Sequence, residues 1–279
     1  MNLTLKILLI VIAIIVVIAL ALPSILNLAG LHPKFDGNSF NLKGKKALII
    51  ATNHGILNKP GETDGKPTGL FLSELSIPYY DFKKSNIEVD IASIKGGKIP
   101  MEPVPFFIDT PEDKRFKKDT GAMSKLQNST PIKDIDFTEY DIIFISGGWG
   151  GAYDLGFSEL LGEKISEAYY LSKAIIGGVC HGVLGLIKAK DKDGNLLIAG
   201  RKMTGVTDKQ LKELGIMFTP QHPEEELRKA GAIFQSETAF KDIFATLTVV
   251  DDEKRFVTGQ NQNSGHETSY AMMEILNSQ

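Results

Sequence analysis

The chain has 279 residues, with 31 Lys and Arg against 34 Asp and Glu, so its formal net charge is −3. This balance argues against a nucleic-acid partner, because such binding rests on clustered basic charge. A single cysteine excludes a scaffold held by intramolecular disulfides, and 43% apolar with 23% charged residues excludes an intrinsically disordered chain.

An apolar leader opens the chain. No charged residue occurs from residue 7 to residue 31, and residues 5–26 supply the roughly 20 apolar residues that a membrane-spanning helix needs. A cleaved signal peptide is one alternative, although its small-residue cleavage pattern lies inside the apolar run. A buried helix is the other. We expect residues 1–31 to form a transmembrane anchor (or signal peptide) and residues 40–279 to form one domain.

Lysines on either side of the leader bear on its orientation. One precedes the apolar run and four follow it: Lys6, then Lys34, Lys43, Lys45 and Lys46. Positively charged flanks tend to stay in the cytoplasm, and an unpaired cysteine suits a reducing compartment. We therefore expect a single-pass membrane protein with its soluble domain on the cytoplasmic face.

Strand and helix patterns alternate beyond residue 45. Short apolar strands are predicted at 46–52, 87–92, 140–146 and 174–178, with further strands near 196–200 and 246–259. Helices are predicted at 68–75 (stopped by Pro78), 158–173, 183–189 and 266–277. Repeated β–α units of this kind indicate an α/β fold, a doubly wound parallel sheet sandwiched by helices.

The sharpest chemical pattern follows the strand at 174–178. Residues 178–182 read Gly-Val-Cys-His-Gly, which matches a nucleophile elbow with Cys180 as the nucleophile. Glycines are needed there because side chains on a strained strand-to-helix turn would clash with neighbouring backbone. The N-terminus of the following helix would favour the thiolate. The plainer interpretation is a small buried cysteine.

Two other segments are predicted near this elbow, since the carboxyl ends of parallel strands gather ligands and chemistry. Residues 147–151 read Gly-Gly-Trp-Gly-Gly, and their exposed N–H groups could form an oxyanion hole facing Cys180. A tight turn without a ligand is the alternative. Glu74 stands in an otherwise apolar helical pattern, where a surface carboxylate is the default interpretation.

Together these motifs resemble the ThiJ/PfpI superfamily, with its class I glutamine amidotransferase-like fold, and most closely its branch of heat-shock chaperones and glutathione-independent glyoxalases. The resemblance covers roughly residues 45–276. Its matching stretches occur in the family's order at 64–69 with Glu74, 95–100, 147–148, 178–182, 204–207, 224–227 and 258–261.

The resemblance implies roles for the matching residues. Cys180 would be the nucleophile, His181 its general base, and Glu74 a largely protonated acid beside the sulfur. The backbone N–H groups of Gly148 and His181 would form the oxyanion hole, with Gly147 and Trp149 beside the same pocket. The sequence departs from the pattern at two places. The third, orienting acid of the triad falls in register with Leu211, with Asp208 the nearest candidate, and Trp149 replaces a common histidine.

The implied reaction is the conversion of a small 2-oxoaldehyde, such as methylglyoxal, to a 2-hydroxy acid without a metal or organic cofactor. A redox sensor or holdase chaperone without turnover remains an alternative, because the third acid is not recognisable. Amidase or glutamine amidotransferase chemistry is a lesser one, suggested by His-Pro-Glu at 222–224. The expected partners are a small carbonyl substrate, the membrane and, by resemblance, a second copy in a homodimer. The other histidines, His32, His54 and His266, show no metal-ligand spacing.

Overall fold

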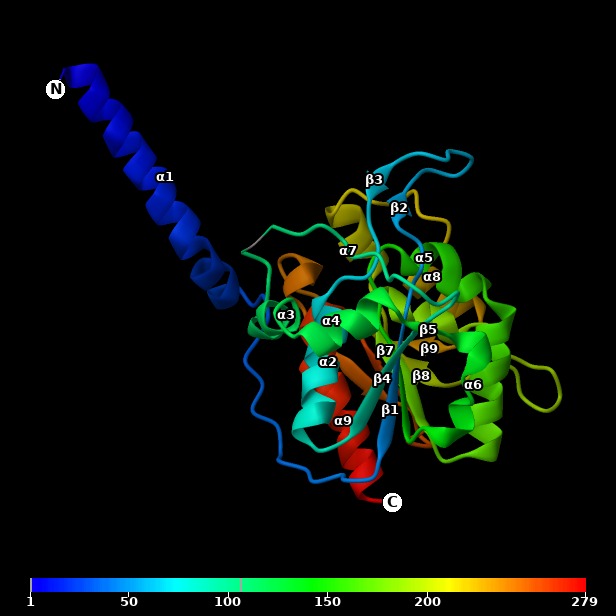
Figure 1. Ribbon diagram of the computed structural model, residues 1–279. Coiled ribbons are helices and arrows are strands. Elements are labelled where there is room, and N and C mark those ends of the chain that lie inside the picture. The colour runs from blue at the N-terminus through cyan, green and yellow to red at the C-terminus, as the bar shows by residue number, and fades with distance from the viewer. Residues whose placement is uncertain (1, 106) are drawn as a thin grey trace.

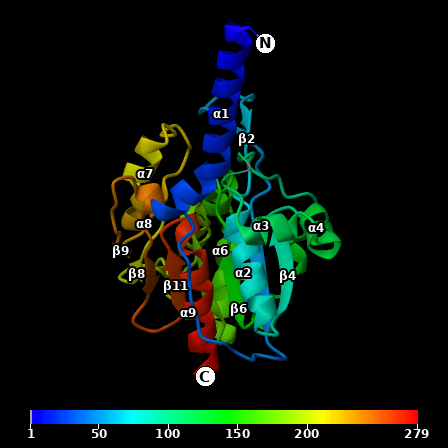
Figure 2. The same ribbon diagram turned by 90° about the vertical axis from the view of Figure 1, so that its left-hand side faces the viewer.

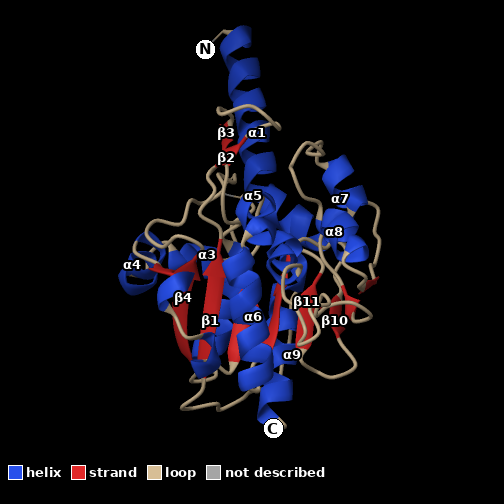
Figure 3. Ribbon diagram, turned by 90° about the vertical axis from the view of Figure 1, so that its right-hand side faces the viewer, coloured by secondary structure: helices blue, strands red, loops and turns tan. Residues whose placement is uncertain are grey.

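The computed structural model describes residues 2–105 and 107–279. Over these residues the body has three layers, with helices covering both faces of a central sheet (Figures 1 and 3). The strand order in that seven-stranded sheet is β10-β11-β7-β6-β1-β4-β5. Its strands are β1 (Lys46–Ala51), β4 (Glu88–Ser93), β5 (Thr130–Pro131), β6 (Ile142–Ile145), β7 (Ile175–Val179), β10 (Thr248–Val250) and β11 (Phe256–Gly259). Two small two-stranded sheets pair β2 (Ile56–Leu57) with β3 (Lys66–Pro67), and β8 (Lys202–Met203) with β9 (Ile233–Phe234).

The sheet is mostly parallel, as predicted, with one exception at its edge. β10 pairs antiparallel to β11, whereas every other neighbouring pair in the sheet is parallel. The single strand predicted near 246–259 is in fact this hairpin, because the chain turns at residues 251–255. The strand predicted near 196–200 is also wrong: that segment is a turn, and the strand begins only at Lys202.

Each face of the sheet carries its own apolar core. Successive side chains of a strand point to opposite faces. In β1, Ile49 packs into the core beneath α2 (Ser73–Lys84) and α9 (Gly265–Asn277), while Ile50 packs into the core beneath α6 (Glu159–Leu171). The other α-helices of the body are short: α3 (Pro111–Phe116), α4 (Thr120–Gln127), α5 (Gly151–Asp154), α7 (Asp208–Glu213) and α8 (Pro223–Lys229).

The first helix after β1 starts and ends later than predicted. Residues 68–72 are not helical, and α2 runs from Ser73 through Pro78 to Lys84. A proline inside a helix removes one backbone donor, here the one that would bond the carbonyl of Glu74. The helix continues because ten of its twelve residues are buried, among them the face that packs on α9. Tertiary packing therefore overrides the local stop signal.

A long apolar helix projects from the body at the N-terminus. α1 (Leu3–Leu28) has a mean hydropathy of 3.3 over its most apolar stretch and no buried residue, so its length and composition fit a membrane span and equally a signal sequence. It stands clear of the three layers (Figures 1 and 2). The residues just after α1, Gly30 and Leu31, nevertheless pack against the body, and we call them the foot of α1. Leu31 is 2% exposed, and the Asn263 side chain donates to the Gly30 carbonyl at 2.9 Å.

Candidate active site

Cys180 stands on a strained turn at the end of β7. Its φ is +56°, in the left-handed region that side chains rarely adopt. A Cβ on Gly178 or Gly182 would lie 2.2 or 2.1 Å from the Ile145 carbonyl oxygen, so neither position accepts a larger residue. The predicted strained turn and the predicted reason for its glycines are confirmed, while the role of Cys180 as the nucleophile stays a prediction. The helix predicted at 183–189 is instead a 3₁₀ segment, η4 (Cys180–Leu186).

Two side chains and two backbone N–H groups surround the sulfur. The Sγ atom lies 3.4 Å from Nδ1 of His181, the neighbouring residue. The buried Glu74 carboxyl, in the first turn of α2, lies next to the same thiol, close enough for each group to shift the pKa of the other. Backbone N–H groups of His181 and Gly148 also point at the sulfur. The structure thus brings the elbow, the first helix and the glycine-rich loop to one point.

Burial sets the protonation states of these groups. Desolvation raises the pKa of Glu74 to about 8, with help from the nearby Glu102 carboxyl and against the effects of Cys180 and the Gly147 backbone, which lower it. Desolvation lowers the pKa of His181 to about 3. It also raises the pKa of Cys180, against the two backbone N–H groups that favour the anion. Burial therefore opposes the predicted thiolate, which stays a prediction. At neutral pH Glu74 is mostly protonated and His181 is neutral, while burial disfavours the Cys180 thiolate.

The glycine-rich loop after β6 lets backbone approach the reacting groups. A Cβ on Gly147 would lie 2.5 Å from Oε2 of Glu74 and 2.7 Å from the His181 nitrogen. Gly148 has a φ of +99°, and a Cβ there would lie 2.3 Å from the Phe71 nitrogen. Substitution at either glycine would thus push the loop away from the sulfur.

A small cavity of about 60 Å³ opens onto the thiol. Trp149 forms one wall, with its ring centroid 4.9 Å from that of His181. Glu102 forms another part of the lining, and its Oε2 accepts the Trp149 backbone N–H at 3.4 Å. Burial raises the pKa of Glu102 to about 7. Sequence reasoning missed this second acid, whose only signal was its place two residues beyond the matching stretch at 95–100.

Asp208 does not contact His181. Its carboxylate lies 4.0 Å from Nδ1 of His222, and Glu225 lies 3.8 Å from the same atom. Nε2 of His181 has no hydrogen-bond partner among the described residues. His222 is close enough to His181 to lower its pKa. Any influence of Asp208 on His181 would thus have to pass through His222.

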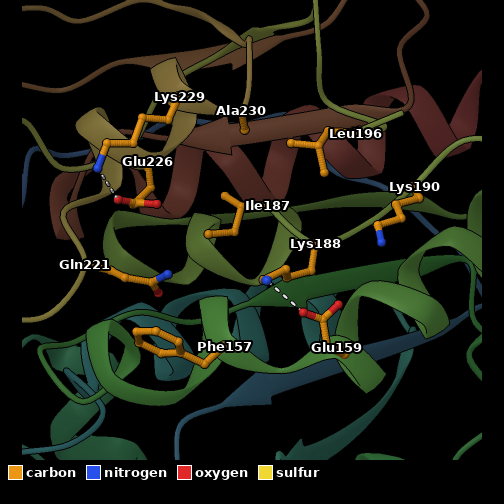
Figure 4. Close-up of a pocket in the computed structure, with 10 residues that line it drawn as sticks. All are labelled: Phe157, Glu159, Ile187, Lys188, Lys190, Leu196, Gln221, Glu226, Lys229 and Ala230. Atoms are coloured by element: carbon orange, nitrogen blue, oxygen red, sulfur yellow. Dashed lines mark hydrogen bonds and ion pairs between the residues drawn. The ribbon is translucent and has the colours of Figure 1, made fainter. Parts of the chain in front are cut away.

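A larger hollow of about 340 Å³ lies outside this site (Figure 4). Two of the lysines around it are neutralised by glutamates: Lys188 pairs with Glu159 at 2.7 Å, and Lys229 pairs with Glu226 at 2.9 Å. Its lining contains no cysteine or histidine, so the thiol chemistry belongs to the smaller cavity. Within residues 2–105 and 107–279, no three His, Cys, Asp or Glu side chains cluster as metal ligands would.

Known proteins share this fold and site region. A model of the DJ-1/PfpI family matches residues 68–275. Glyoxalase 3 of Candida albicans is 30% identical over 80% of this chain and 95% of its own length. Glutathione-independent glyoxalase HSP31 of Saccharomyces cerevisiae is 28% identical over 83% of this chain and 98% of its own length. Among solved structures, Rapid Encystment Protein 24 KDa of Francisella tularensis superposes with a TM-score of 0.74 at 30% identity, covering 83% of this chain and 99% of that one.

Proposed function

The chain belongs to the DJ-1/PfpI family, and on that basis we propose that it converts a small 2-oxoaldehyde, such as methylglyoxal, to a 2-hydroxy acid without glutathione. The names of its relatives support the glyoxalase class. The observation that carries the proposal is the Cys180 thiol, held between the neutral imidazole of His181 and the protonated carboxyl of Glu74. Such a site has a nucleophile, a base and an acid within one small cavity.

The first step forms a hemithioacetal. Sγ of Cys180 bonds to the aldehyde carbon while Nδ1 of His181 accepts the thiol proton. Glu74 gives its carboxyl proton to the aldehyde oxygen, so the C=O double bond is lost and the adduct itself is neutral, with Glu74 left as a carboxylate and His181 as an imidazolium. N–H groups of Gly148 and His181, which already point at the sulfur, would stabilise charge on that oxygen.

The second step moves hydrogen between the two substrate carbons. Glu74, now a carboxylate, removes the proton from the sulfur-bearing carbon, and the imidazolium of His181 gives its proton to the ketone oxygen, which yields an enediol. Return of a proton to the second carbon, with loss of the hydroxyl proton on the first, leaves a thioester. Water then breaks the carbon–sulfur bond, which releases the 2-hydroxy acid and restores the thiol.

The alternatives fit the site less well. A redox sensor needs an accessible, low-pKa thiol, whereas Cys180 is 7% exposed and burial raises its pKa. Amidotransferase-like chemistry would need His222 at the sulfur, but the recorded neighbours of its Nδ1 are Asp208 and Glu225. The imidazole bonded to the sulfur belongs to His181.

The test uses the full chain in detergent, mixed with methylglyoxal and no glutathione, with lactate as the readout. We expect lactate from the wild type and none from Cys180→Ser. Glu74→Gln should lower kcat by about 100-fold or more, because positioned acids and bases contribute about 10²–10⁴. Glu88→Gln, the same change at an exposed carboxyl on β4 outside the cavity, is the control and should retain the wild-type rate. Equal lactate from wild type and Cys180→Ser would overturn the proposal.

We also propose that α1 anchors the protein in a membrane, with the body on the cytoplasmic face. Its 26 residues, lack of burial and flanking lysines support this. Carbonate extraction of membranes from cells expressing the full chain tests it. An anchored chain stays in the pellet at its full length, whereas a shortened chain in the supernatant would indicate a cleaved signal peptide.

A further inference from the structure

Three large apolar side chains are exposed on neighbouring segments at one end of the body. Leu214 and Met217 follow α7 and are each 44% exposed, and Phe240 lies on the loop before η5 (Asp242–Phe244) and is 92% exposed. We call these three residues the apolar rim. Lys212 and Lys241, both exposed, flank it in sequence. Solitary exposed apolar residues are ordinary, but a fully exposed Phe beside two others on adjoining segments is a feature to explain.

The apolar rim lies beside the foot of α1. A Cβ on Gly30, just after α1, would lie 3.4 Å from the Phe244 carbonyl oxygen, so η5 contacts the foot of the helix. Asn263 ties the two together, donating to the carbonyls of Gly30 and Ile243 at 2.9 and 3.1 Å. In Figures 1 and 2, α7 and the foot of α1 lie at the same end of the body, opposite the C-terminus.

The segments of the rim are also joined to one another. Lys209, in α7, donates to the Ala239 carbonyl at 2.8 Å and pairs with Asp242 at 2.6 Å. These contacts hold the Phe240 loop against α7 and leave the Phe240 ring outside. The rim is therefore a fixed part of the surface next to the anchor.

The rim adjoins the catalytic cavity. Leu214 lines that cavity as well as the surface, together with Ile243 and Gln262. Ile243 belongs to η5, and its carbonyl accepts from both Gln262 and Asn263. Thus one short stretch of structure links the foot of α1, the apolar rim and the lining around Cys180.

We propose that the apolar rim rests in the surface of the bilayer that holds α1, so that the catalytic cavity lies at the lipid–water boundary. The proposal rests on the anchoring role of α1 proposed above. We expect the apolar rim to contact lipid rather than a partner protein, because the foot of α1 is packed against the body and so holds this end of the body at the bilayer. Lysines beside apolar residues suit that boundary, since their stems lie along apolar surface while the ammonium groups remain in water.

The experiment uses the full chain carrying Cys180→Ser and Phe240→Cys, reconstituted in phosphatidylcholine vesicles and labelled at position 240 with an environment-sensitive fluorophore. Removing Cys180 leaves only the introduced thiol, because the chain has one natural cysteine. The matched control moves the label to Leu171→Cys. Leu171 is 74% exposed and ends α6, so it lies at the amino ends of the strands, away from the rim. Spin-labelled lipid is then added as a quencher.

We expect emission from position 240 to shift to shorter wavelength and to fall by at least half with the spin-labelled lipid, while position 171 changes little. A label at Leu214→Cys should behave like the one at position 240. Equal, weak quenching at positions 240 and 171 would overturn the proposal, as would a shift without lipid quenching, which would indicate a protein contact. Flotation of the same vesicles reports anchoring separately. Chains that fail to float overturn the anchor and the rim together, whereas floating chains with unquenched position 240 overturn the rim alone.

Discussion

Replacing Glu74 with glutamine should make the protein more stable at neutral pH, although it removes a proposed catalytic acid. The fold raises the pKa of Glu74 from 4.5 to about 8 because the carboxyl is fully desolvated. Between these values the folded chain keeps a proton that the unfolded chain has released. The free energy of unfolding therefore falls as pH rises through this interval, by about 1.4 kcal/mol per pH unit.

The size of this effect on the free energy of unfolding depends on how far the pH lies above 4.5. At pH 7 the interval above 4.5 is 2.5 pH units, so ionisation of Glu74 in the unfolded chain disfavours folding by about 3 kcal/mol. At pH 5 the same penalty is below about 1 kcal/mol. Glutamine mimics the protonated acid and carries no such penalty. For a body of this size, about 3 kcal/mol corresponds to a Tm higher by about 6–12 °C.

Thermal unfolding of the full chain in detergent, followed by circular dichroism at pH 5 and pH 7, measures this. The decisive quantity is the change with pH in the Tm difference between Glu74→Gln and the wild type, since packing defects of the amide cancel in it. Glu88→Gln, an exposed position on β4, is the control and should shift Tm little at either pH. A Tm difference that does not grow from pH 5 to pH 7 would refute the reasoning.

Two further predictions concern the elbow and the third acid. Gly182→Ala should destabilise the fold by several kcal/mol in chemical denaturation, because its Cβ would lie 2.1 Å from the Ile145 carbonyl oxygen. The control is Gly121→Ala, in α4 with no contact below 3.4 Å, which should be neutral or stabilising by up to about 1 kcal/mol. Similar losses of stability at both positions would contradict the steric argument. Asp208→Asn should lower kcat/KM with methylglyoxal by less than about tenfold, since its carboxylate faces His222 and a true orienting acid is worth about 10⁴. A loss of that larger size would instead establish Asp208 as the missing acid.

The local elements that form the nucleophile turn could be predicted from the chain alone. A short apolar strand followed by Gly-Val-Cys-His-Gly predicts a tight turn at Cys180. Only glycine tolerates the approach of the Ile145 carbonyl on both sides of that cysteine. The positions of β1, β4, β6 and β7 along the chain followed from the same kind of local pattern. The pairing of Glu74 with the thiol did not, since a single Glu in a helical pattern carries no sign of what it faces; only the family resemblance suggested it.

The chemistry of the site was decided by tertiary structure. Packing carries α2 through Pro78 and so places Glu74 in a dry interior, where its pKa rises to about 8. The same burial brings in Glu102, 28 positions further along the chain, and raises the pKa of Cys180. The apolar leader was evident from composition, but its docking beside the catalytic cavity depends on contacts between residues more than 200 positions apart. Sequence determines which groups are present and which turns they need. Desolvation and long-range contact, which no local pattern encodes, decide their protonation and their neighbours.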